Sequence, residues 1–592
     1  MAAGTSGNTV GAKVNGSGVK ASDTEDFCWS EALAELTGSA ASPSINIGAV
    51  CCDRQVALGQ GARIGVRWLG RGQERRDLSF QDLSDLSGRA ASVLTSLGLQ
   101  SGDTVAVLLG RVPELYISAL GIWKAGGVYC PLFSAFGPGP IKARLELGRA
   151  RFLITTEDLF TRKVVPNLSD LPDLQHVVLV GEDGRSARAM ERCSDFYAQL
   201  KAAAPMAPVA TRQEDPAFMH FTSGTTGTPK GAVQPHRAVL AHLVTGRTVF
   251  GLVPDDVFWC TADPGWVTST AYGIIAPLVC CATTLVDEAD VEPRRWYGIL
   301  ADERVTAWYT TPTSIRTMMR YGAALARSYR ENSLRVAASV GEPLNVEAVQ
   351  WGQKALGVPF LDTWWQTETG AIVIANHRNC VSKPGSMGQA LPGVETALVR
   401  CESGVAHMVT EPDTVGELAI HSGWPSLFCG YLGEYDRAEG CFRGDWYLTG
   451  DLVKRDAEGF FWFVGRADDM IKSGGLRIGP FEVEASLMDH PAVAEIGVVS
   501  KPDLLLREVP VAFVSLNPGF ESGDALRLEL LSFARQELGA GMAPREIHFV
   551  AELPKTNTGK IMRRMLKAKA SGESDEADIP TLQPCPGRFD DE

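Results

Sequence analysis

A run of eleven residues at 221–231, Phe-Thr-Ser-Gly-Thr-Thr-Gly-Thr-Pro-Lys-Gly, places glycines and hydroxylated residues ahead of a lysine. Glycines let a backbone approach an anion closely, and hydroxyl groups and Lys230 add donors and a positive charge. The run therefore predicts a phosphate-binding loop rather than a flexible surface loop, and the apolar residues before it predict a strand that leads into it. It lacks the Gly-x-x-x-x-Gly-Lys-Ser/Thr spacing of a Walker loop, which opens a helix.

Further segments have the residue types that a nucleotide site needs. Residues 447–451, Tyr-Leu-Thr-Gly-Asp, end in a carboxylate. An ionised Asp only accepts hydrogen bonds, which suits the two hydroxyl donors of a ribose. The alternative for Asp451 is a turn-capping role, because Thr-Gly-Asp is common in turns.

The elements that must position these segments follow from the apolar pattern. Short apolar runs at 104–109 and 152–155 alternate with helical patterns such as 115–124. Such alternation is typical of α/β layers with largely parallel sheets. A polar, glycine-rich segment at 465–475 follows an aromatic strand and precedes a helical pattern at 481–488, which indicates a linker to a C-terminal domain.

Length and composition set further limits. A chain of 592 residues exceeds one ordinary hydrophobic core, so we expect at least two domains. The net charge of −14 disfavours nucleic acid and anionic membranes as partners. The cysteines show no zinc-type spacing, and reduced thiols, together with an N-terminus that lacks a secretory signal, predict a cytoplasmic protein. The uncharged stretch 264–286 is interrupted by Pro277, so we expect buried strand and helix rather than a membrane span.

Five segments in order resemble the signature motifs of the adenylate-forming enzymes, a superfamily that contains acyl-CoA synthetases, luciferases and peptide-synthetase adenylation domains. They lie at 222–231, 261–268, 339–343, 362–370 and 553–560. The chain is most similar to AMP-forming acetyl-CoA synthetases, and the resemblance covers about residues 26–570. It implies an α/β fold with a large multi-layer N-terminal domain and a small mobile α+β C-terminal domain.

The domain boundaries follow from this resemblance and from composition. We expect a disordered tail at 1–25, a large ATP- and acyl-binding domain at 26–467, and a small domain at 468–570 after a hinge at Asp468. Residues 571–592 are acidic and are expected to form a second disordered tail.

The resemblance also implies the reaction and its cofactors. A carboxylate attacks the α-phosphate of ATP to give an acyl adenylate and pyrophosphate, and the thiol of coenzyme A then attacks the acyl carbon. Pyrophosphate is a highly charged leaving group, so Mg²⁺ and cationic or hydroxyl donors are expected around it. By resemblance Glu368 binds this Mg²⁺, and Thr367 donates to the phosphate. The alternative for Glu368 is a solvated carboxylate at a strand end.

The remaining nucleotide contacts are assigned by resemblance alone. Arg466 is placed beside Asp451 at the ribose. The cofactor-binding residues in the signature segments are Thr222, Ser223, Gly224, Thr225, Thr226, Gly227, Lys230, Gly341, Glu342, Pro343, Asp362, Thr363, Trp364 and Gln366.

Trp365 decides the predicted substrate, because a tryptophan at this position in the family closes the floor of the acyl pocket. Val267, Thr268 and Val340 would line its walls and leave room for two or three carbons. The alternative is a core aromatic residue unrelated to ligand. Trp266 and Arg535 are assigned to coenzyme A. Departures from the family pattern occur at Ser269, beside the acyl pocket, and at Gly474 and Leu476, beside the expected coenzyme contacts.

The small domain is expected to serve two catalytic states. In the family, a lysine matching Lys560 bridges carboxylate and nucleotide during adenylation, and Arg477 matches an arginine of the thioester-forming state. The alternative for Lys560 is an ordinary solvated charge. Acetylation would remove its charge, so a protein lysine acetyltransferase and deacetylase are expected partners. By the same resemblance, a family cation site matches Met488, His490 and Val493, and the alternative is a purely structural role.

The sequence therefore predicts an acetate:CoA ligase that uses ATP, Mg²⁺ and coenzyme A. Three alternatives stay open: a ligase for propionate or another short-chain acid, an adenylation enzyme that acylates a carrier protein, and a nucleotide-binding scaffold without catalysis. The last is disfavoured because Glu368, Asp451, Arg466 and Lys560 are all present.

Overall fold

The structure, a computed structural model, describes residues 19–20, 27–181, 192–223, 229–329, 333–377, 382–402, 405–467, 469–473, 476–555 and 561–572. The chain divides into two compact units, one of residues 1–449 and 453–463 and the other of residues 450–452 and 464–592. The predicted hinge at Asp468 lies outside the described residues. Most residues of both predicted tails also lie outside the described residues. Val19–Lys20 is described: it forms strand β1 and pairs with β18 (Glu395–Glu402). The backbones of these two residues extend the edge of a sheet.

The first sheet of the larger unit is parallel except at one edge, and its strand order is β21-β10-β9-β5-β4-β6-β7-β8. The apolar runs predicted as strands are β4 and β6, which lie side by side with parallel register. Strand β10 runs antiparallel to β9, and β21 runs antiparallel to β10. The strands are β4 Thr104–Leu108, β5 Val128–Pro131, β6 Phe152–Thr156, β7 His176–Val180, β8 Cys193–Asp195, β9 Pro216–Ser223, β10 Pro229–Pro235 and β21 Gly430–Tyr431.

The second sheet has the order β17-β16-β15-β14-β13-β11-β12-β2-β3. Its middle strands, β15 to β2 in this order, are all parallel, whereas β3, β16 and β17 are antiparallel edges. The strands are β2 Ile64–Leu69, β3 Arg75–Ser79, β11 Val257–Cys260, β12 Thr283–Asp287, β13 Ala307–Thr310, β14 Val336–Ser339, β15 Phe360–Trp364, β16 Ile374–Ala375 and β17 Gln389–Ala390.

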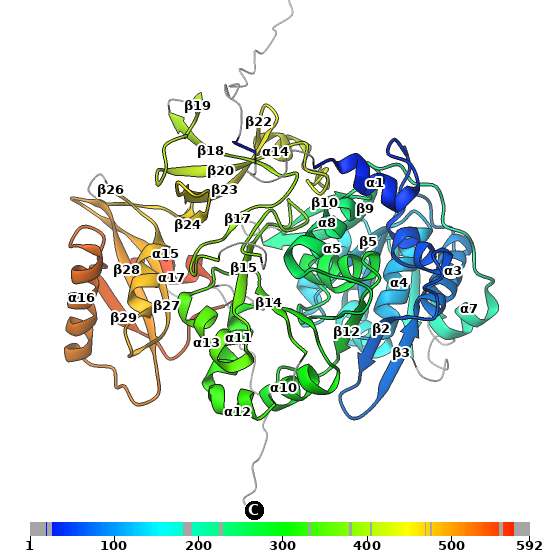
Figure 1. The fold of residues 1–592 in the computed structure, drawn as a ribbon, viewed down its shortest axis with the longest axis horizontal. Coiled ribbons are helices and arrows are strands. Elements are labelled where there is room, and N and C mark those ends of the chain that lie inside the picture. Colours follow the sequence, from blue (N-terminus) through cyan, green and yellow to red (C-terminus); the bar gives the residue numbers. More distant parts are fainter. Residues whose placement is uncertain are drawn as a thin grey trace, which may run out of the picture. The chain divides into compact units, whose positions relative to one another are not determined.

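Helices fill a central layer between these two sheets and cover their outer faces. Strands of both sheets place alternate residues in one central core, where they pack against α3 (Phe80–Ser96), α4 (Pro113–Lys124) and α8 (Ala238–Phe250). Figure 1 shows α3 and α4 side by side, and a Cβ added to Gly121 would lie only 2.7 Å from the Ala90 Cβ. Successive side chains of a strand point to opposite faces of the sheet, so every second residue of each strand faces this helical layer.

The other helices of the larger unit cover the outer faces or lie near the surface. Helix α5 packs on the outer face of the first sheet, and α10, α11 and α13 pack on the outer face of the second. The bounds are α1 Trp29–Thr37, α2 Arg54–Ala57, α5 Pro138–Leu147, α6 Glu157–Leu159, α7 Phe196–Ala202, α9 Ala276–Val279, α10 Pro293–Asp302, α11 Pro312–Arg320, α12 Gly322–Ser328, α13 Val346–Leu356 and α14 Tyr435–Gly440. Short π and 3₁₀ helices occupy Ala49–Asp53, Phe160–Val164, Val165–Asp170 and Ser269–Ile275.

The uncharged stretch at 264–286 is buried, as its interruption by Pro277 predicted. It forms the π-helix Ser269–Ile275, then α9 and β12. Among the residues that the structure describes, no helix combines the length and apolar content required to cross a bilayer.

An antiparallel sheet completes the larger unit. Strands β1, β18, β20, β23 and β22 follow in this order, and β19 and β24 pair with β18 and β23. Residues 450–452, in the middle of β23, belong to the smaller unit. The further bounds are β19 Val405–Met408, β20 Val415–His421, β22 Phe442–Arg443, β23 Trp446–Arg455 and β24 Phe461–Arg466.

The smaller unit is an α+β fold built on the long hairpin of β27 (Val493–Asp503) and β28 (Arg507–Leu516). Strand side chains alternate between two cores, so that α15 (Pro480–Met488) and α16 (Asp524–Leu538) cover one face and α17 (Arg563–Ser571) covers the other. Figure 1 shows α16 along the edge of this unit, in orange. The remaining strands are β25 Ile471–Ser473, β26 Leu476–Ile478 and β29 Glu546–Phe549.

Candidate nucleotide and acyl site

The signature segments of the second sheet all leave the same edge. Segment 261–268 follows β11, segment 340–343 follows β14, and segment 365–370 follows β15. These strands are parallel neighbours, with β13 between β11 and β14. Because the carboxyl ends of parallel strands meet at one edge, where α/β sheets bind their ligands, the fold brings these segments together.

The predicted phosphate loop joins two antiparallel strands. Thr222 on β9 is the register partner of Lys230 on β10, and the intervening residues 224–228 lie outside the described residues. These include the predicted phosphate contacts Gly224, Thr225, Thr226 and Gly227, and only the backbone of Ser223 is described. Because a strand rather than a helix follows the loop, the geometry agrees with the sequence in excluding a Walker loop.

Glu368 and Lys230 are brought together by a tyrosine that the sequence analysis did not identify. The Tyr431 hydroxyl donates a 2.8 Å hydrogen bond to Glu368 Oε1. Lys230 Nζ lies 5.2 Å from the centroid of the Tyr431 ring. Tyr431 reaches this place because β21 pairs with β10, with Ala232 opposite Tyr431. A carboxylate and a cation, each expected at a metal-bound polyphosphate, thus share one aromatic neighbour.

The backbone around Thr367 and Glu368 is held by buried side chains from other elements. Gln234 Nε2 donates to the carbonyl oxygens of Thr367 and Glu368 at 2.8 and 3.2 Å. Trp424 Nε1 donates to the Thr369 carbonyl at 2.7 Å, and His242 Nε2 donates to the Gly370 carbonyl at 3.0 Å. The segment that carries Glu368 is therefore rigidly positioned before any ligand binds.

Gly370 is required in this segment for two reasons. Its φ of +66° is unfavourable for residues with a side chain, and a Cβ would lie 2.4 Å from Ser426 Oγ. One sequence feature could have indicated the supporting side chains that were missed: Gln234 and His242 are polar residues inside otherwise apolar strand and helix patterns.

Asp362 and Gln366 use their polar groups within the protein. The Asp362 carboxylate accepts from the Thr363 N–H at 2.9 Å and the Leu344 N–H at 3.4 Å, and burial raises the pKa of this carboxyl to about 8. The Gln366 amide accepts from the Tyr447 hydroxyl at 3.0 Å and donates to the Thr449 carbonyl at 2.9 Å. Both residues therefore order the walls around the strand ends.

The Gly341-Glu342-Pro343 segment is fixed by helix α11. Thr313 Oγ1 donates to Glu342 Oε1 at 2.8 Å, and Arg316 forms a 2.7 Å ion pair with Oε2. Gly341 adopts a φ of +94°, which turns the chain directly after β14. A Cβ at Gly341 would lie 3.9 Å from the Trp266 ring, so segments 261–268 and 340–343 are in close proximity.

The residues predicted for the acyl pocket lie around the central core. Trp365 and Val267 are partly buried against this core, and Val340 belongs to it. Thr268 is buried at the start of the π-helix, and the Ser269 hydroxyl packs against Gly273, where an added Cβ would lie 3.2 Å from it. The departure at Ser269 is thus accommodated by a glycine one turn away.

His220, within β9, contacts segment 261–268 and the π-helix that follows it. Its Nδ1 lies 3.2 Å from the Gly265 carbonyl, and its Nε2 lies 2.9 Å from Thr270 Oγ1. A carbonyl only accepts, so Nδ1 carries the proton and Nε2 accepts from the threonine. Burial lowers the pKa of His220 to about 4, so the ring is neutral at physiological pH.

In the smaller unit, Asp451 and Arg466 form an ion pair with a 2.8 Å separation between Oδ1 and Nη1. They lie on the paired strands β23 and β24, where the Ala467 N–H donates to the Gly450 carbonyl at 2.8 Å and a Cβ at Gly450 would lie 2.8 Å from the arginine. The structure therefore places the predicted ribose residues side by side.

Other predicted residues of the smaller unit are only partly described. Arg477 lies on β26 with its backbone alone described, and Arg535 is exposed in the last turn of α16. Lys560, Gly474 and Gly475 lie outside the described residues. His490 Nδ1 accepts from the Ala492 N–H at 3.2 Å, Met488 packs at the edge of the core, and the Val493 carbonyl accepts from Asn517 at 3.0 Å. In the described parts of the chain, His, Cys, Asp and Glu side chains form no group of three or more suited to a metal ion.

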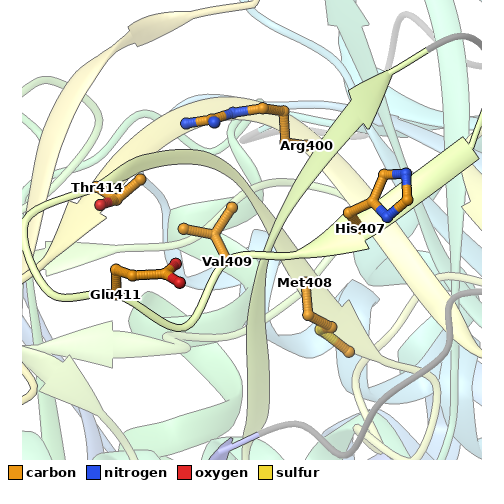
Figure 2. Close-up of a pocket in the computed structure, with 6 residues that line it drawn as sticks. All are labelled: Arg400, His407, Met408, Val409, Glu411 and Thr414. Carbon is orange, nitrogen blue, oxygen red and sulfur yellow. The ribbon is translucent and has the colours of Figure 1, made fainter.

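A separate pocket lies on the antiparallel sheet of the larger unit. It has a volume of about 170 Å³ and is lined by Arg400, His407, Met408, Val409, Glu411 and Thr414 (Figure 2). None of these residues belongs to the signature segments.

The fold and the strand-end site define a nucleotide-binding ligase architecture, and the chain belongs to the AMP-binding enzyme family. The model of this family matches residues 53–432, and that of the AMP-binding enzyme C-terminal domain matches residues 482–560. The adenylate-forming fold that the sequence predicted is thereby confirmed.

Similar proteins cover most of the chain. The acetyl-coenzyme A synthetase of Bacillus subtilis (strain 168) is 43% identical over 83% of this chain and 84% of its own length. That of Pyrobaculum aerophilum is 36% identical over 91% of this chain and 85% of its own length. The crystal structure of the Brucella canis acyl-CoA synthetase covers 92% of this chain and 97% of its own, with 36% identity and a TM-score of 0.71.

Proposed function

We propose that this protein is an AMP-forming acetate:CoA ligase, which converts acetate, ATP and coenzyme A to acetyl-CoA, AMP and pyrophosphate through an acetyl adenylate. One observation carries the proposal: segment 365–370 holds Trp365 against Tyr309 and, three residues later, Glu368 against Tyr431. An acyl-pocket residue and a metal-type carboxylate are thus fixed on one short rigid segment. The names of the similar proteins, acetyl-coenzyme A synthetases, support the same substrate.

The first half-reaction requires two anions, the acid and the triphosphate, to meet. Lys230 and the loop after Thr222 would hold the β- and γ-phosphates, and Thr367 would donate to the α-phosphate. Charge neutralisation by these donors lowers the repulsion that the attacking carboxylate meets. Lys560 is proposed to bridge the carboxylate and the nucleotide in this step only.

Glu368 is suited to hold Mg²⁺, because Mg²⁺ prefers carboxylate oxygens and keeps several waters. Its carboxylate is part-exposed and oriented by Tyr431, which fits an ion that approaches from solvent with ATP. When bound, Mg²⁺ would neutralise charge on the leaving pyrophosphate.

The second half-reaction is proposed to use other residues of the smaller unit. Arg477 and Gly474-Gly475 are assigned to it, with Trp266, Thr268 and Arg535 at coenzyme A. A change of backbone conformation at Asp468 would separate the two states, with a large domain at 26–467 and a small domain at 468–570. The proposal further includes a cation at Met488, His490 and Val493, a cytoplasmic location, and reversible acetylation of Lys560.

Pyrophosphate release from straight-chain acids of two to eight carbons, with and without coenzyme A, tests the function. Acetate should give about one equivalent of pyrophosphate per enzyme without coenzyme A and continuous turnover with it. Glu368→Gln is the matched variant, because it keeps the shape of the side chain and removes its charge, and it should release little pyrophosphate.

Each alternative has a distinct result. Preference for propionate or a longer acid would name that substrate instead. Acetate-dependent pyrophosphate without any effect of coenzyme A would indicate transfer to a carrier protein. Absence of acid-dependent pyrophosphate for all acids would reject the proposal.

A further inference from the structure

Tyr309 on β13 is buried and contacts two of the segments proposed to form the acyl pocket, 261–268 and 362–370. Its carbonyl accepts a 3.0 Å hydrogen bond from the N–H of Thr261, which opens segment 261–268. Its hydroxyl lies 3.0 Å from Trp365 Nε1 and 2.7 Å from Thr363 Oγ1. We propose that Tyr309 is a specificity-determining positioning residue, which fixes the Trp365 indole and thereby the acyl length that the enzyme accepts. This inference rests on the proposed function.

The direction of every hydrogen bond in this cluster can be assigned. The Ser339 carbonyl only accepts, so Thr363 Oγ1 gives its one proton to it, at 2.7 Å. Thr363 must then accept from the Tyr309 hydroxyl. An indole N–H only donates, so Tyr309 accepts from Trp365. The chain therefore runs from Trp365 through Tyr309 and Thr363 to Ser339 without a conflict, and burial raises the pKa of Tyr309 so that its hydroxyl keeps the proton it donates.

The hydrogen bond to Tyr309 fixes the rotation of the Trp365 ring. An indole carries a single polar atom, and here it is satisfied by the tyrosine hydroxyl. Tyr272 packs edge-on against the same indole at 5.4 Å between centroids, and Phe250 packs against Tyr309 at 4.9 Å. Rotating the indole would break this hydrogen bond and disturb the packing against Tyr272.

The same chain connects the pocket floor to its wall. It ends at the carbonyl of Ser339, the last residue of β14, and the next residue is Val340. The chain thus links Trp365 to the end of β14, one residue before Val340. A small shift of the tyrosine hydroxyl would move both surfaces that meet the end of the acyl chain.

The test is the ratio of kcat/KM for propionate to that for acetate, measured by pyrophosphate release in the full-length enzyme. Tyr309→Phe removes only the hydroxyl, so the indole is free to rotate and the pocket becomes less selective. We expect the ratio to rise by about tenfold, the size of discrimination that one methylene supports. KM for acetate should rise, whereas kcat should change little.

Tyr272→Phe is the matched control. Tyr272 is also fully buried and touches the same indole, but its hydroxyl accepts from the Ile372 N–H at 2.8 Å and pairs with Thr245. It should lose stability without changing the ratio. An equal change of ratio in both variants would overturn the inference, because any core hydroxyl would then have this effect.

A double-mutant cycle tests the bond itself. Trp365→Phe removes the indole donor, so adding Tyr309→Phe to it should change the ratio no further. Independent effects that multiply would overturn the inference. If Tyr309→Phe does not fold, Thr363→Val provides a second test. It removes the acceptor of the tyrosine hydroxyl at nearly constant shape, and it should also raise the ratio of kcat/KM for propionate to that for acetate. An unchanged ratio would count against the inference.

The result also separates the two proposals. A wild-type enzyme that releases no pyrophosphate with either acid would refute the proposed function. A wild-type enzyme that activates acetate, with a ratio unchanged within about twofold in Tyr309→Phe, would refute only the role of Tyr309.

Discussion

The hydroxyl group of Tyr431 offers the sharpest test of how the metal-type carboxylate is held. Tyr431→Phe removes the 2.8 Å hydrogen bond to Glu368 Oε1 and leaves the ring near Lys230 in place. The variant therefore separates orientation of the carboxylate from the cation–π contact. Tyr431→Leu removes both interactions and serves as the comparison.

The expected magnitude follows from the type of bond. A hydrogen bond to a charged group contributes about 1.5–3 kcal/mol. Glu368 is part-exposed, so water replaces some of the lost donor and the lower end of this range applies, about 1.5 kcal/mol. This corresponds to about a tenfold loss in apparent affinity.

The assay is pyrophosphate release at saturating acetate and fixed ATP, with MgCl₂ varied. Tyr431→Phe should need about tenfold more Mg²⁺ for half-maximal rate, whereas its maximal rate at high Mg²⁺ should recover. Thermal unfolding checks that the variant is folded. A folded variant with an unchanged Mg²⁺ dependence would show that the backbone contacts of Gln234 and Trp424 alone orient Glu368, and the proposed role of Tyr431 would be wrong.

Three further predictions concern other parts of the molecule. Trp365→Gly should shift preference toward acids of four to six carbons and lower acetate turnover, with each added methylene worth about 0.8 kcal/mol; unchanged chain-length preference would make Trp365 an ordinary core residue. Lys560→Ala should abolish formation of the acyl adenylate but retain thioester formation from supplied acetyl adenylate, and equal loss in both half-reactions would contradict its assignment. Burial lowers the pKa of His236 from 6.5 to about 4. Between these pH values the unfolded chain binds a proton that the folded chain does not. The free energy of unfolding should therefore fall as the pH falls from 6.5 to 4. At pH 5 the loss in free energy of unfolding is about 2 kcal/mol. His236→Asn retains an acceptor for the Ile47 N–H, and it should flatten the pH dependence of stability measured by urea unfolding. An identical pH dependence in both proteins would show that His236 is not its origin.

The local pattern of the chain was sufficient for the regular elements. The apolar runs at 104–109 and 152–155 form β4 and β6, and the helical patterns at 115–124 and 481–488 form α4 and α15. These predictions succeeded because periodicity of apolar residues directly reflects which side of an element is buried. The pairing of Val19–Lys20 with β18 was missed, since two residues carry no periodicity.

The residues that support the site could not be predicted in the same way. Tyr431, Gln234, Trp424 and Tyr309 act through contacts with residues far away in sequence, such as the bond from Trp424 to the carbonyl of Thr369. A single polar or aromatic residue in an apolar pattern does not reveal which backbone group it will meet, because that depends on the order of strands in the sheets.

The residues with reactive or charged groups can be identified without a structure: the hydroxyl-rich loop with Lys230, the carboxylates of Glu368 and Asp451, and the tryptophan at position 365. The way these groups are held depends on the three-dimensional fold. Parallel order in the second sheet brings segments 261–268, 340–343 and 365–370 to one edge, and the pairing of β21 with β10 sets Tyr431 between Lys230 and Glu368. The amino-acid sequence specifies which side chains are present. The distances between these side chains depend on strand order and burial, which are cooperative properties of the whole fold.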